Sequence, residues 1–219
     1  MGKFITFEGI EGSGKSTHIK LLAGFLNDEK IPALVTQEPA GTEIGRKIGD
    51  ILFNRRHREM FSETELLLFC AARAQHVREV IMPALAAGKY VLCDRFSDAT
   101  FAYQSAGRGL DADFIRTLND YCAPGLKPDL TLLFDLPVEA GLQRAARRDA
   151  KLHDPSLADR FEREKIDFHH RVRDGYESLK RAEPARFRVI DSTQAVGLVA
   201  QDVRRLVMDF IKNGHQPGR

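Results

Sequence analysis

Five short runs of apolar and β-branched residues recur along the chain, each bounded by turn-forming residues. They cover residues 3–7, 33–36, 90–93, 130–134 and 187–190. Runs of this length and composition are typical of buried β-strands. Between them apolar residues return at helical spacing, as in Ile19, Leu22, Ala23 and Leu26 and, towards the end, in Val196, Val199, Val203, Leu206 and Phe210.

This alternation of strand and helix predicts an α/β fold. We expect a five-stranded, mainly parallel sheet flanked by helices on both faces, a three-layer α/β/α arrangement. Right-handed crossovers would bring the strand ends, and with them the functional site, to one edge. No repeat, linker or shift in composition divides the chain, so residues 1–212 are predicted to form a single domain. The Arg- and Asp-rich stretch 144–160 is predicted to be a mobile lid, and 213–219 a frayed tail.

Composition narrows the function classes. The 219 residues carry 33 Lys and Arg against 31 Asp and Glu, a formal net charge of +2, and 43% are hydrophobic. A balanced charge argues against disorder and against a surface built for nucleic acid. No apolar run approaches the roughly 18 residues of a membrane span, so no membrane partner is expected. The three cysteines form no Cys-x-x-Cys pair, which argues against a disulfide framework or a zinc site and favours a cytoplasmic location.

The clearest chemical signal follows the first predicted strand. Residues 9–16 read Gly-Ile-Glu-Gly-Ser-Gly-Lys-Ser and match the phosphate-binding pattern Gly-x-x-x-x-Gly-Lys-Ser/Thr between a strand and a helix. Such a loop wraps a β-phosphate with backbone N–H groups, while Lys15 reaches the β- and γ-oxygens and the Ser16 hydroxyl ligates Mg²⁺. The pattern predicts a P-loop NTPase whose ATP site includes Gly9, Ile10, Glu11, Gly12, Ser13, Gly14, Lys15, Ser16 and Thr17.

A second candidate site lies at the end of the third predicted strand, which reads Cys93-Asp94-Arg95. Beside the phosphate loop, Asp94 stands where a Mg²⁺-linked carboxylate belongs, and Arg95 offers a bidentate fork for a second phosphate. The alternative is an Asp–Arg pair that only caps the strand. Two charges at the functional edge of an α/β sheet are costly without a partner, which favours the functional interpretation.

Nucleotide binding alone leaves a switch, a motor and a kinase open. A guanine-specific switch would be expected to carry an Asn/Thr-Lys-x-Asp motif, and the chain has none. A large assembly ATPase needs further domains, for which 219 residues leave little room.

The sequence resembles the thymidylate kinases over nearly its whole length. The markers are residues 7–17, Gln-Glu-Pro-Ala-Gly-Thr at 37–42, Phe-Cys-Ala-Ala-Arg at 69–73 and the segment 94–104, in the order and spacing of the family. The resemblance implies transfer of the γ-phosphate of ATP to dTMP, giving dTDP and ADP, with Mg²⁺ as cofactor. It also implies a homodimer, for which the apolar helix predicted over residues 64–77 is a plausible contact surface.

The resemblance assigns the dTMP site residue by residue. Phe69 would stack on thymine while Arg73 hydrogen-bonds its polar edge, although periodicity alone would make Phe69 a core aromatic. Thr100 and Gln104 would complete base recognition, and Tyr103 would lie against the sugar. Further residues assigned to the acceptor are Glu38 and Pro39 in the supporting turn, Arg46 and Arg95 at the phosphate, and Glu11 near the 3′-hydroxyl and the phosphates.

The arginines of the lid are expected to complete the catalytic group. Because Gly12 stands where one branch of the family carries an arginine, the chain resembles the bacterial-type branch, in which the lid supplies it. We expect Arg147 or Arg148 to close on the phosphates, and Arg144 and Thr193 to contact ATP. The alternative for Arg147 and Arg148 is a solvated helix face. The resemblance assigns no role to Arg55, Arg56 and Arg58.

Two rival functions remain open. A deoxynucleoside kinase would phosphorylate a neutral hydroxyl and would need a carboxylate base near it. A non-enzymatic nucleotide-dependent switch would bind ATP and transfer no phosphate. Paired acceptor-phosphate arginines and a lid rich in arginine favour the monophosphate kinase.

Overall fold

The computed structural model describes residues 2–151, 160–161 and 164–213. Residues 152–159 of the predicted lid, and all of the predicted tail except Asn213, lie outside the described residues. In the part of the chain that the structure describes, no helix is long and apolar enough to cross a membrane.

The five predicted strands are present and form one sheet. They are β1 (Phe4–Glu8), β2 (Ala33–Gln37), β3 (Tyr90–Asp94), β4 (Leu130–Asp135) and β5 (Phe187–Asp191). Their order is β2-β3-β1-β4-β5, and every neighbouring pair is parallel. The predicted α/β class with helices on both faces is confirmed.

Each strand ends one residue later than its apolar run. The additional residues are polar: Glu8, Gln37, Asp94, Asp135 and Asp191. Their backbones continue the ladder, with Phe7 opposite Asp94 and Asp135 opposite Asp191. A search for apolar runs misses these residues because their side chains are polar, although their backbones take part in the sheet. This edge is where the fold gathers charge.

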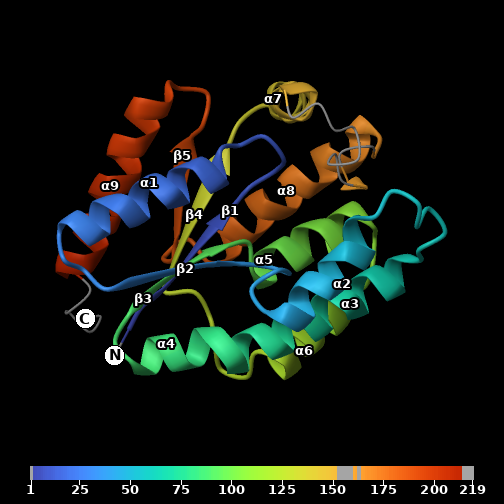
Figure 1. Cartoon of the computed structure of the whole chain (residues 1–219). Helices are drawn as coiled ribbons and strands as arrows, with labels where there is room; N and C mark the ends of the chain where they lie inside the picture. Colours follow the sequence, from blue (N-terminus) through green and yellow to red (C-terminus); the bar gives the residue numbers. More distant parts are fainter. Residues whose placement is uncertain (1, 152–159, 162–163, 214–219) are drawn as a thin grey trace.

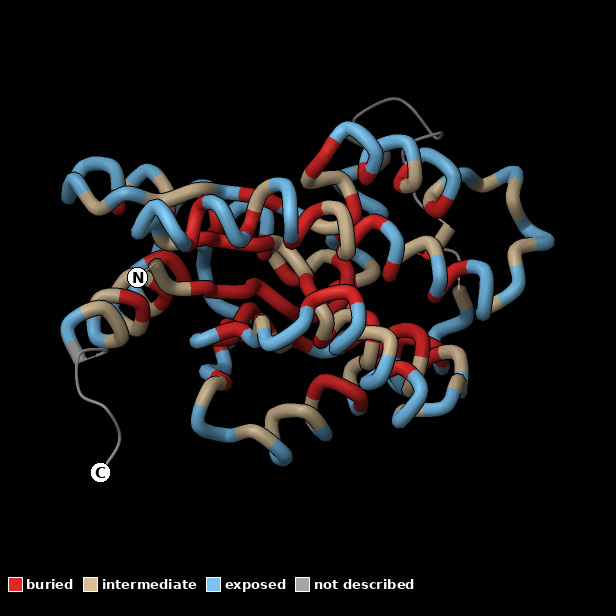
Figure 2. Tube along the Cα trace, turned by 90° about the horizontal axis from the view of Figure 1, so that it is seen from below, coloured by how far each residue is buried: buried red, intermediate tan, exposed pale blue. Residues whose placement is uncertain are grey.

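Helices cover both faces of the sheet (Figure 1). On one face lie α1 (Lys15–Asp28) and α9 (Val196–Asn213), whose apolar residues pack against β1 and β4 through Ile5, Phe7 and Leu132. The opposite face is covered by the π-helix η1 (Val77–Ile81) and α4 (Met82–Ala86), which pack on Phe4 and Val91. Figure 2 shows the buried residues concentrated along the strands in the middle of the molecule.

The remaining helices are arranged beside the polar edge. They are α2 (Glu43–Phe53), α3 (Ser62–His76), α5 (Ser97–Thr100), the π-helix η2 (Phe101–Gly107), α6 (Ala112–Cys122), α7 (Val138–Lys151) and α8 (Ile166–Ala182). A third apolar cluster joins η2 to α8 through Ala102, Phe168 and Val172. It brings segments about 65 residues apart in the sequence to the same side of the site.

Two predicted boundaries differ from the structure. The helix predicted over 64–77 begins at Ser62 and continues through η1 into α4, where Pro83 lies in the first turn. Proline lacks a backbone N–H, and the π-helical turn before it adjusts the hydrogen-bond ladder. The predicted lid starts inside a helix, because residues 144–151 are the last part of α7. Ala145 is buried on the same helix face as Val138, which makes this part amphipathic.

Candidate active site

The loop between β1 and α1 can form only with glycine at particular positions. Gly9 and Gly12 have φ angles of 135° and 68°, in the left-handed range that favours glycine. A Cβ on Gly9 would lie 2.3 Å from the carbonyl oxygen of Phe134, and one on Gly12 would lie 2.0 Å from that of Gly141. The loop is therefore held tightly between β4 and the first turn of α7.

Lys15 is buried at the centre of this loop. Its Nζ donates to the carbonyl oxygens of Gly9 and Ile10, both at 2.8 Å, and to Ser13 Oγ at 3.1 Å. Burial, together with the nearby charge of Arg95, lowers the pKa of Lys15 to about 8. Both effects disfavour an isolated cation, so an anion placed between Lys15 and Arg95 would be strongly attracted.

Ser16 and Asp94 supply the oxygens that a metal-bound nucleotide needs. The Ser16 hydroxyl donates to Asp94 Oδ2 at 2.7 Å. A hydroxyl and a carboxylate are hard oxygen ligands of the kind that Mg²⁺ prefers. Among the described residues no group of three or more His, Cys, Asp or Glu could hold a metal alone. The donor set therefore fits an ion that is carried in by phosphate oxygens.

Arg95 is fixed on three sides. Its backbone is left-handed, with φ at 65°, directly after β3. Nη1 donates to the Tyr176 hydroxyl at 3.2 Å, Nη2 donates to Glu11 Oε1 at 3.2 Å, and the guanidinium lies 4.8 Å from the centre of the Tyr103 ring. Although burial lowers the pKa of Arg95, the surrounding oxygens raise it well above its ordinary value. A permanent, oriented positive charge results.

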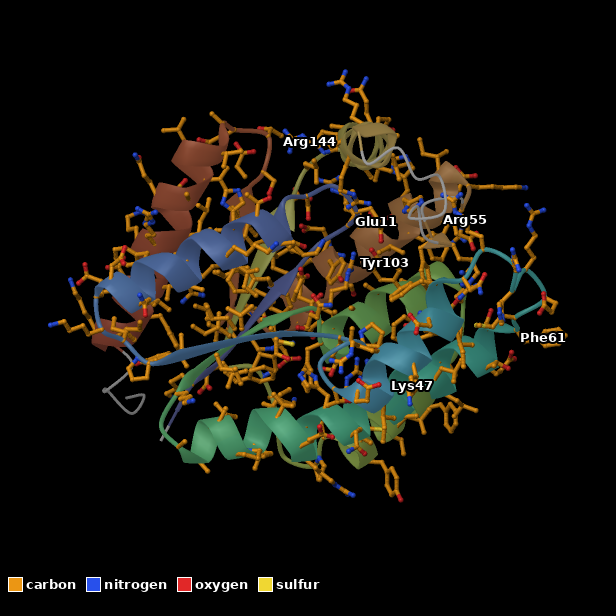
Figure 3. The ribbon with its side chains drawn as sticks, in the orientation of Figure 1. Glu11, Lys47, Arg55, Phe61, Tyr103 and Arg144 are labelled. Atoms are coloured by element: carbon orange, nitrogen blue, oxygen red, sulfur yellow. The ribbon has the colours of Figure 1, made fainter. Side chains whose placement is uncertain are left out.

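Glu11 stands beside Arg95 as a buried carboxylate. Tyr103 donates to its Oε1 at 2.5 Å, and His169 Nδ1 lies 3.3 Å from Oε2 without hydrogen-bond geometry. Burial would raise the pKa of Glu11, but His169, Arg95 and Tyr103 together lower it to about 2. Figure 3 shows Glu11 and Tyr103 together at the centre of the molecule, with Arg144 above them on α7.

A single cavity of about 500 Å³ connects the phosphate loop to an aromatic pocket. One end is lined by loop residues and by Arg144 and Arg148 of α7. The other end is lined by the aromatic rings of Phe53, Phe69, Tyr103 and Phe161 and by the polar side chains of Glu38, Arg73, Thr100 and Gln104. A cationic end for phosphate and an aromatic end with a few polar groups for the base together match the chemistry of a nucleotide.

Arg73 is fully buried in the wall of the aromatic pocket. Nε and Nη2 donate to Glu38 Oε2 at 2.9 and 2.7 Å, and Nη2 also donates to the Thr100 hydroxyl at 2.8 Å. Nη1 donates to Asn119 Oδ1 at 2.6 Å. Because a guanidinium has five N–H groups, one N–H of Nη1 has no acceptor among the described residues.

Comparison with known proteins agrees with this geometry. The family description that matches the chain is "Thymidylate kinase", over residues 7–203. The chain belongs to the thymidylate kinase family. It is 52% identical over 205 residues to a thymidylate kinase of Syntrophus aciditrophicus, a match that covers 94% of each chain. A thymidylate kinase of Geobacter sulfurreducens is 50% identical over 211 residues, covering 96% of this chain and 99% of that one. The family resemblance predicted from the sequence is confirmed.

Most residues that the thymidylate kinase resemblance assigns to the site line the one cavity. They are Glu11, Gly12, Ser13, Gly14, Lys15, Ser16, Thr17, Glu38, Phe69, Arg73, Asp94, Arg95, Thr100, Tyr103, Gln104, Arg144 and Arg148. Gly9 and Ile10 lie behind the loop, where both accept from Lys15. Pro39 is buried in the turn after β2 and does not line the cavity.

Three predicted residues lie away from the cavity walls. Arg46 is exposed on α2 and paired with Glu43 one turn earlier. Arg147 lies on the exposed side of α7, whereas Arg148 lines the cavity. Thr193 donates to Asp191 Oδ1 at 2.6 Å, next to Ser192, whose carbonyl oxygen accepts from Arg144 Nη1 at 2.7 Å. Because Arg144 contacts the loop after β5 at Ser192, Arg144 and Thr193, both predicted to bind ATP, lie close together.

Several residues that line or adjoin the cavity carried no signal that the sequence analysis used. Phe53 and Phe161 complete the aromatic pocket, and the Phe161 ring lies 6.1 Å from that of Phe69. Tyr176 and His169 reach Arg95 and Glu11 from α8. A search for buried polar residues on otherwise amphipathic helices would have drawn attention to His169 and Tyr176. No local pattern identifies Phe161.

Proposed function

We propose that this protein transfers the γ-phosphate of ATP to dTMP, giving dTDP and ADP, with Mg²⁺ bound to the nucleotide. The observation that carries the proposal is that one cavity is lined both by the phosphate loop and by an aromatic pocket with a few polar groups. The family's name describes the same activity. ATP would occupy the loop end and dTMP the aromatic end.

Each site residue takes a role in this proposal. Lys15 binds the β- and γ-phosphates, Ser16 and Asp94 hold the nucleotide's Mg²⁺, and Arg95 binds the acceptor phosphate. Bound Mg²⁺ would neutralise charge on the phosphate oxygens. Phe69 stacks on the base, while Arg73, Thr100 and Gln104 contact its polar edge. Arg144 and Arg148 lie on α7 above the loop, where they can offset the charge of the transferring group. Arg46 would need to leave Glu43 to reach the acceptor.

The chemistry needs no general base. The second pKa of a phosphate monoester is about 6, so a nucleoside monophosphate is already largely a dianion at neutral pH. Catalysis therefore consists of bringing two polyanions together and stabilising a loose transition state, which Lys15 and the arginines provide. The deoxynucleoside kinase alternative requires a carboxylate base at the 5′-hydroxyl. Glu11, with a pKa of about 2, would be a weak base there.

The test is a coupled ADP-release assay with ATP and Mg²⁺. In parallel reactions dTMP, dUMP, dCMP, dGMP, AMP and thymidine are offered as acceptors, and the product is identified. We expect turnover mainly with dTMP. Turnover of thymidine instead would establish the deoxynucleoside kinase alternative, and ATP binding without any transfer would establish the switch.

We also propose a homodimer, a single domain and a cytoplasmic location. The helices α2, α3 and α6 expose large apolar side chains, among them Ile44, Leu67, Phe114 and Tyr121, which support a contact surface there. Residues 1–212 would form one kinase domain, with a lid that begins within α7. Cys70, Cys93 and Cys122 are free thiols, which suits a reducing compartment.

A further inference from the structure

Gln104 lines the aromatic pocket, and its side chain is hydrogen-bonded to a residue outside the pocket. The residue lies in η2 and is only 1% exposed. Its Nε2 donates to Glu65 Oε1 of α3 at 2.9 Å. Glu65 does not line the cavity, so this carboxylate reaches a ligand only through Gln104.

Glu65 accepts from four donors. Oε1 accepts from Gln104 and from Arg108 Nε, at 2.9 and 3.1 Å, and Oε2 accepts from Arg108 Nη2 at 3.1 Å and from Arg160 Nη2. A carboxylate has about four lone-pair positions and no proton to donate. Glu65 therefore requires Gln104 to present its nitrogen, which turns the amide oxygen away from Glu65.

The oxygen of Gln104 is available to a ligand. Among the described residues none donates to it, and it is not one of the fully buried polar atoms that lack a partner. Because Gln104 lines the cavity, its amide oxygen is a hydrogen-bond acceptor for a molecule bound there. Arg73, one N–H of which has no acceptor among the described residues, lines the same cavity.

We infer that Glu65 is a positioning residue for base selection: it holds the carboxamide of Gln104 so that the pocket accepts the N–H of an imide base, thymine or uracil, and rejects cytosine. This inference rests on the proposed function. An imide offers an N–H between two carbonyl groups, whereas cytosine offers an acceptor nitrogen beside an amino group. Two acceptors that face each other leave both unpaired, which a hydrogen-bonding site discriminates against strongly.

The surroundings of Glu65 resist rotation of this amide. Arg108 is held between Glu65 and Glu164, with Nη1 donating to Glu164 at 2.6 Å, and its guanidinium lies 4.6 Å from the centre of the Phe168 ring. Arg160 donates to the carbonyl oxygen of Leu52 as well as to Glu65. Rotating Gln104 would direct its oxygen at a carboxylate that is already surrounded by donors of its own.

The experiment compares kcat/KM for dTMP and dCMP in four proteins: wild type, Glu65→Gln, Gln104→Met and the double variant. A glutamine at position 65 can pair with either orientation of Gln104, so we expect the dTMP-to-dCMP ratio to fall about tenfold. In the Gln104→Met background, Glu65→Gln should leave the ratio unchanged, because the amide that it positions is absent. Glu164→Gln is the matched control: it removes another partner of Arg108 without touching Gln104, and should keep the wild-type ratio.

Equal losses of kcat/KM for both nucleotides in Glu65→Gln would overturn the inference, since a purely structural role predicts them. A shift in the ratio that persists in the Gln104→Met background would also overturn it. If Glu65→Gln does not fold, Glu65→Asp tests the same contact, because its carboxylate ends one methylene short of Gln104. An unchanged ratio in that variant would contradict the proposal. Absence of dTMP turnover in the wild type would instead count against the proposed function.

Discussion

At the scale of single residues, the position of Arg95 depends on a tyrosine that does not itself line the cavity. The Tyr176 hydroxyl accepts from Arg95 Nη1 and donates to Glu8 Oε2 at 2.8 Å. One hydroxyl thus connects a guanidinium that lines the cavity to the carboxyl group of Glu8 in the core. Because Arg95 is rigid only through such contacts, its orientation depends on Tyr176.

Replacing Tyr176 with Phe should weaken use of the acceptor more than binding of ATP. The change removes one of the two hydrogen-bond acceptors of Arg95, so we expect kcat/KM for dTMP to fall about tenfold while KM for ATP stays near the wild-type value. Steady-state kinetics with each substrate varied in turn measure both. Tyr90→Phe, at the start of β3 and therefore at the end of the strand remote from Arg95, is the control. Equal effects on the two substrates would contradict this role.

Glu8 makes stability depend on pH. Burial, with a further contribution from the charge of Asp98, raises its pKa from 4.5 to about 8. The folded state therefore holds a proton that the unfolded state releases above about pH 4.5, so this group's contribution to stability is full below pH 4.5 and is lost as pH rises to 8.

Glu8→Gln, which resembles the protonated acid, should remove that loss. We expect the free energy of unfolding of the variant to rise relative to that of the wild type between pH 4.5 and pH 8. The difference should reach on the order of a few kcal/mol and should stay constant above pH 8. Urea unfolding at several pH values measures it. Glu29→Gln, at an exposed helix end, should show no such trend. A difference that is independent of pH would refute the assignment.

At the scale of elements, the phosphate loop and α7 are in backbone contact. Gly12 packs on the carbonyl of Gly141, and a Cβ on Gly141 would in turn lie 2.6 Å from the carbonyl oxygen of Glu11. The helix that carries Arg144 and Arg148 is therefore placed by its contact with the loop that binds phosphate. An arginine at position 12 would not fit this packing, so at this site arginines can approach the phosphates from α7.

Gly141→Ala should move the two elements apart. In an open helix this change would stabilise by roughly 0.5–1 kcal/mol, but here the added carbon meets backbone, and overpacking costs about 1–3 kcal/mol. We expect a lower free energy of unfolding and a higher KM for ATP. Gly24→Ala in α1, where a Cβ meets nothing within 4 Å, is the matched control and should be stabilising. Equal behaviour of the two variants would show that the contact is unimportant.

At the scale of the whole molecule, three neighbouring helices expose large apolar side chains. The helices α2, α3 and α6 lie together at one side of the molecule (Figure 1), and their exposed apolar side chains are those of Ile44, Ile51, Leu67, Phe114 and Tyr121. Figure 3 shows Phe61, just before α3, extending outward at the margin of this region. Since α3 also provides Phe69 and Arg73, a contact formed there would act directly on the helix that supports the base pocket.

Leu67→Asp should therefore dissociate the proposed homodimer. Leu67 is 54% exposed on α3, and a charge buried there without a partner is costly. Sedimentation velocity should show a dimer for the wild type and a monomer for the variant. Leu198→Asp, at 51% exposure on α9, should remain dimeric. A monomeric wild type would contradict the dimer.

The parts of this protein that follow a local pattern can be predicted from its amino-acid sequence alone. The five strands, the phosphate loop from Gly9 to Ser16 and the Asp94-Arg95 pair could all be predicted, because periodicity and motif spacing act over a few residues. The contacts of Glu65, Tyr176 and Phe161, by contrast, depend on the folded arrangement of distant segments. Tyr176 and Glu8 are 168 positions apart, and Glu65 and Arg160 are 95 apart. Such contacts depend on how helices pack around the sheet, and packing leaves no repeating signal in one chain.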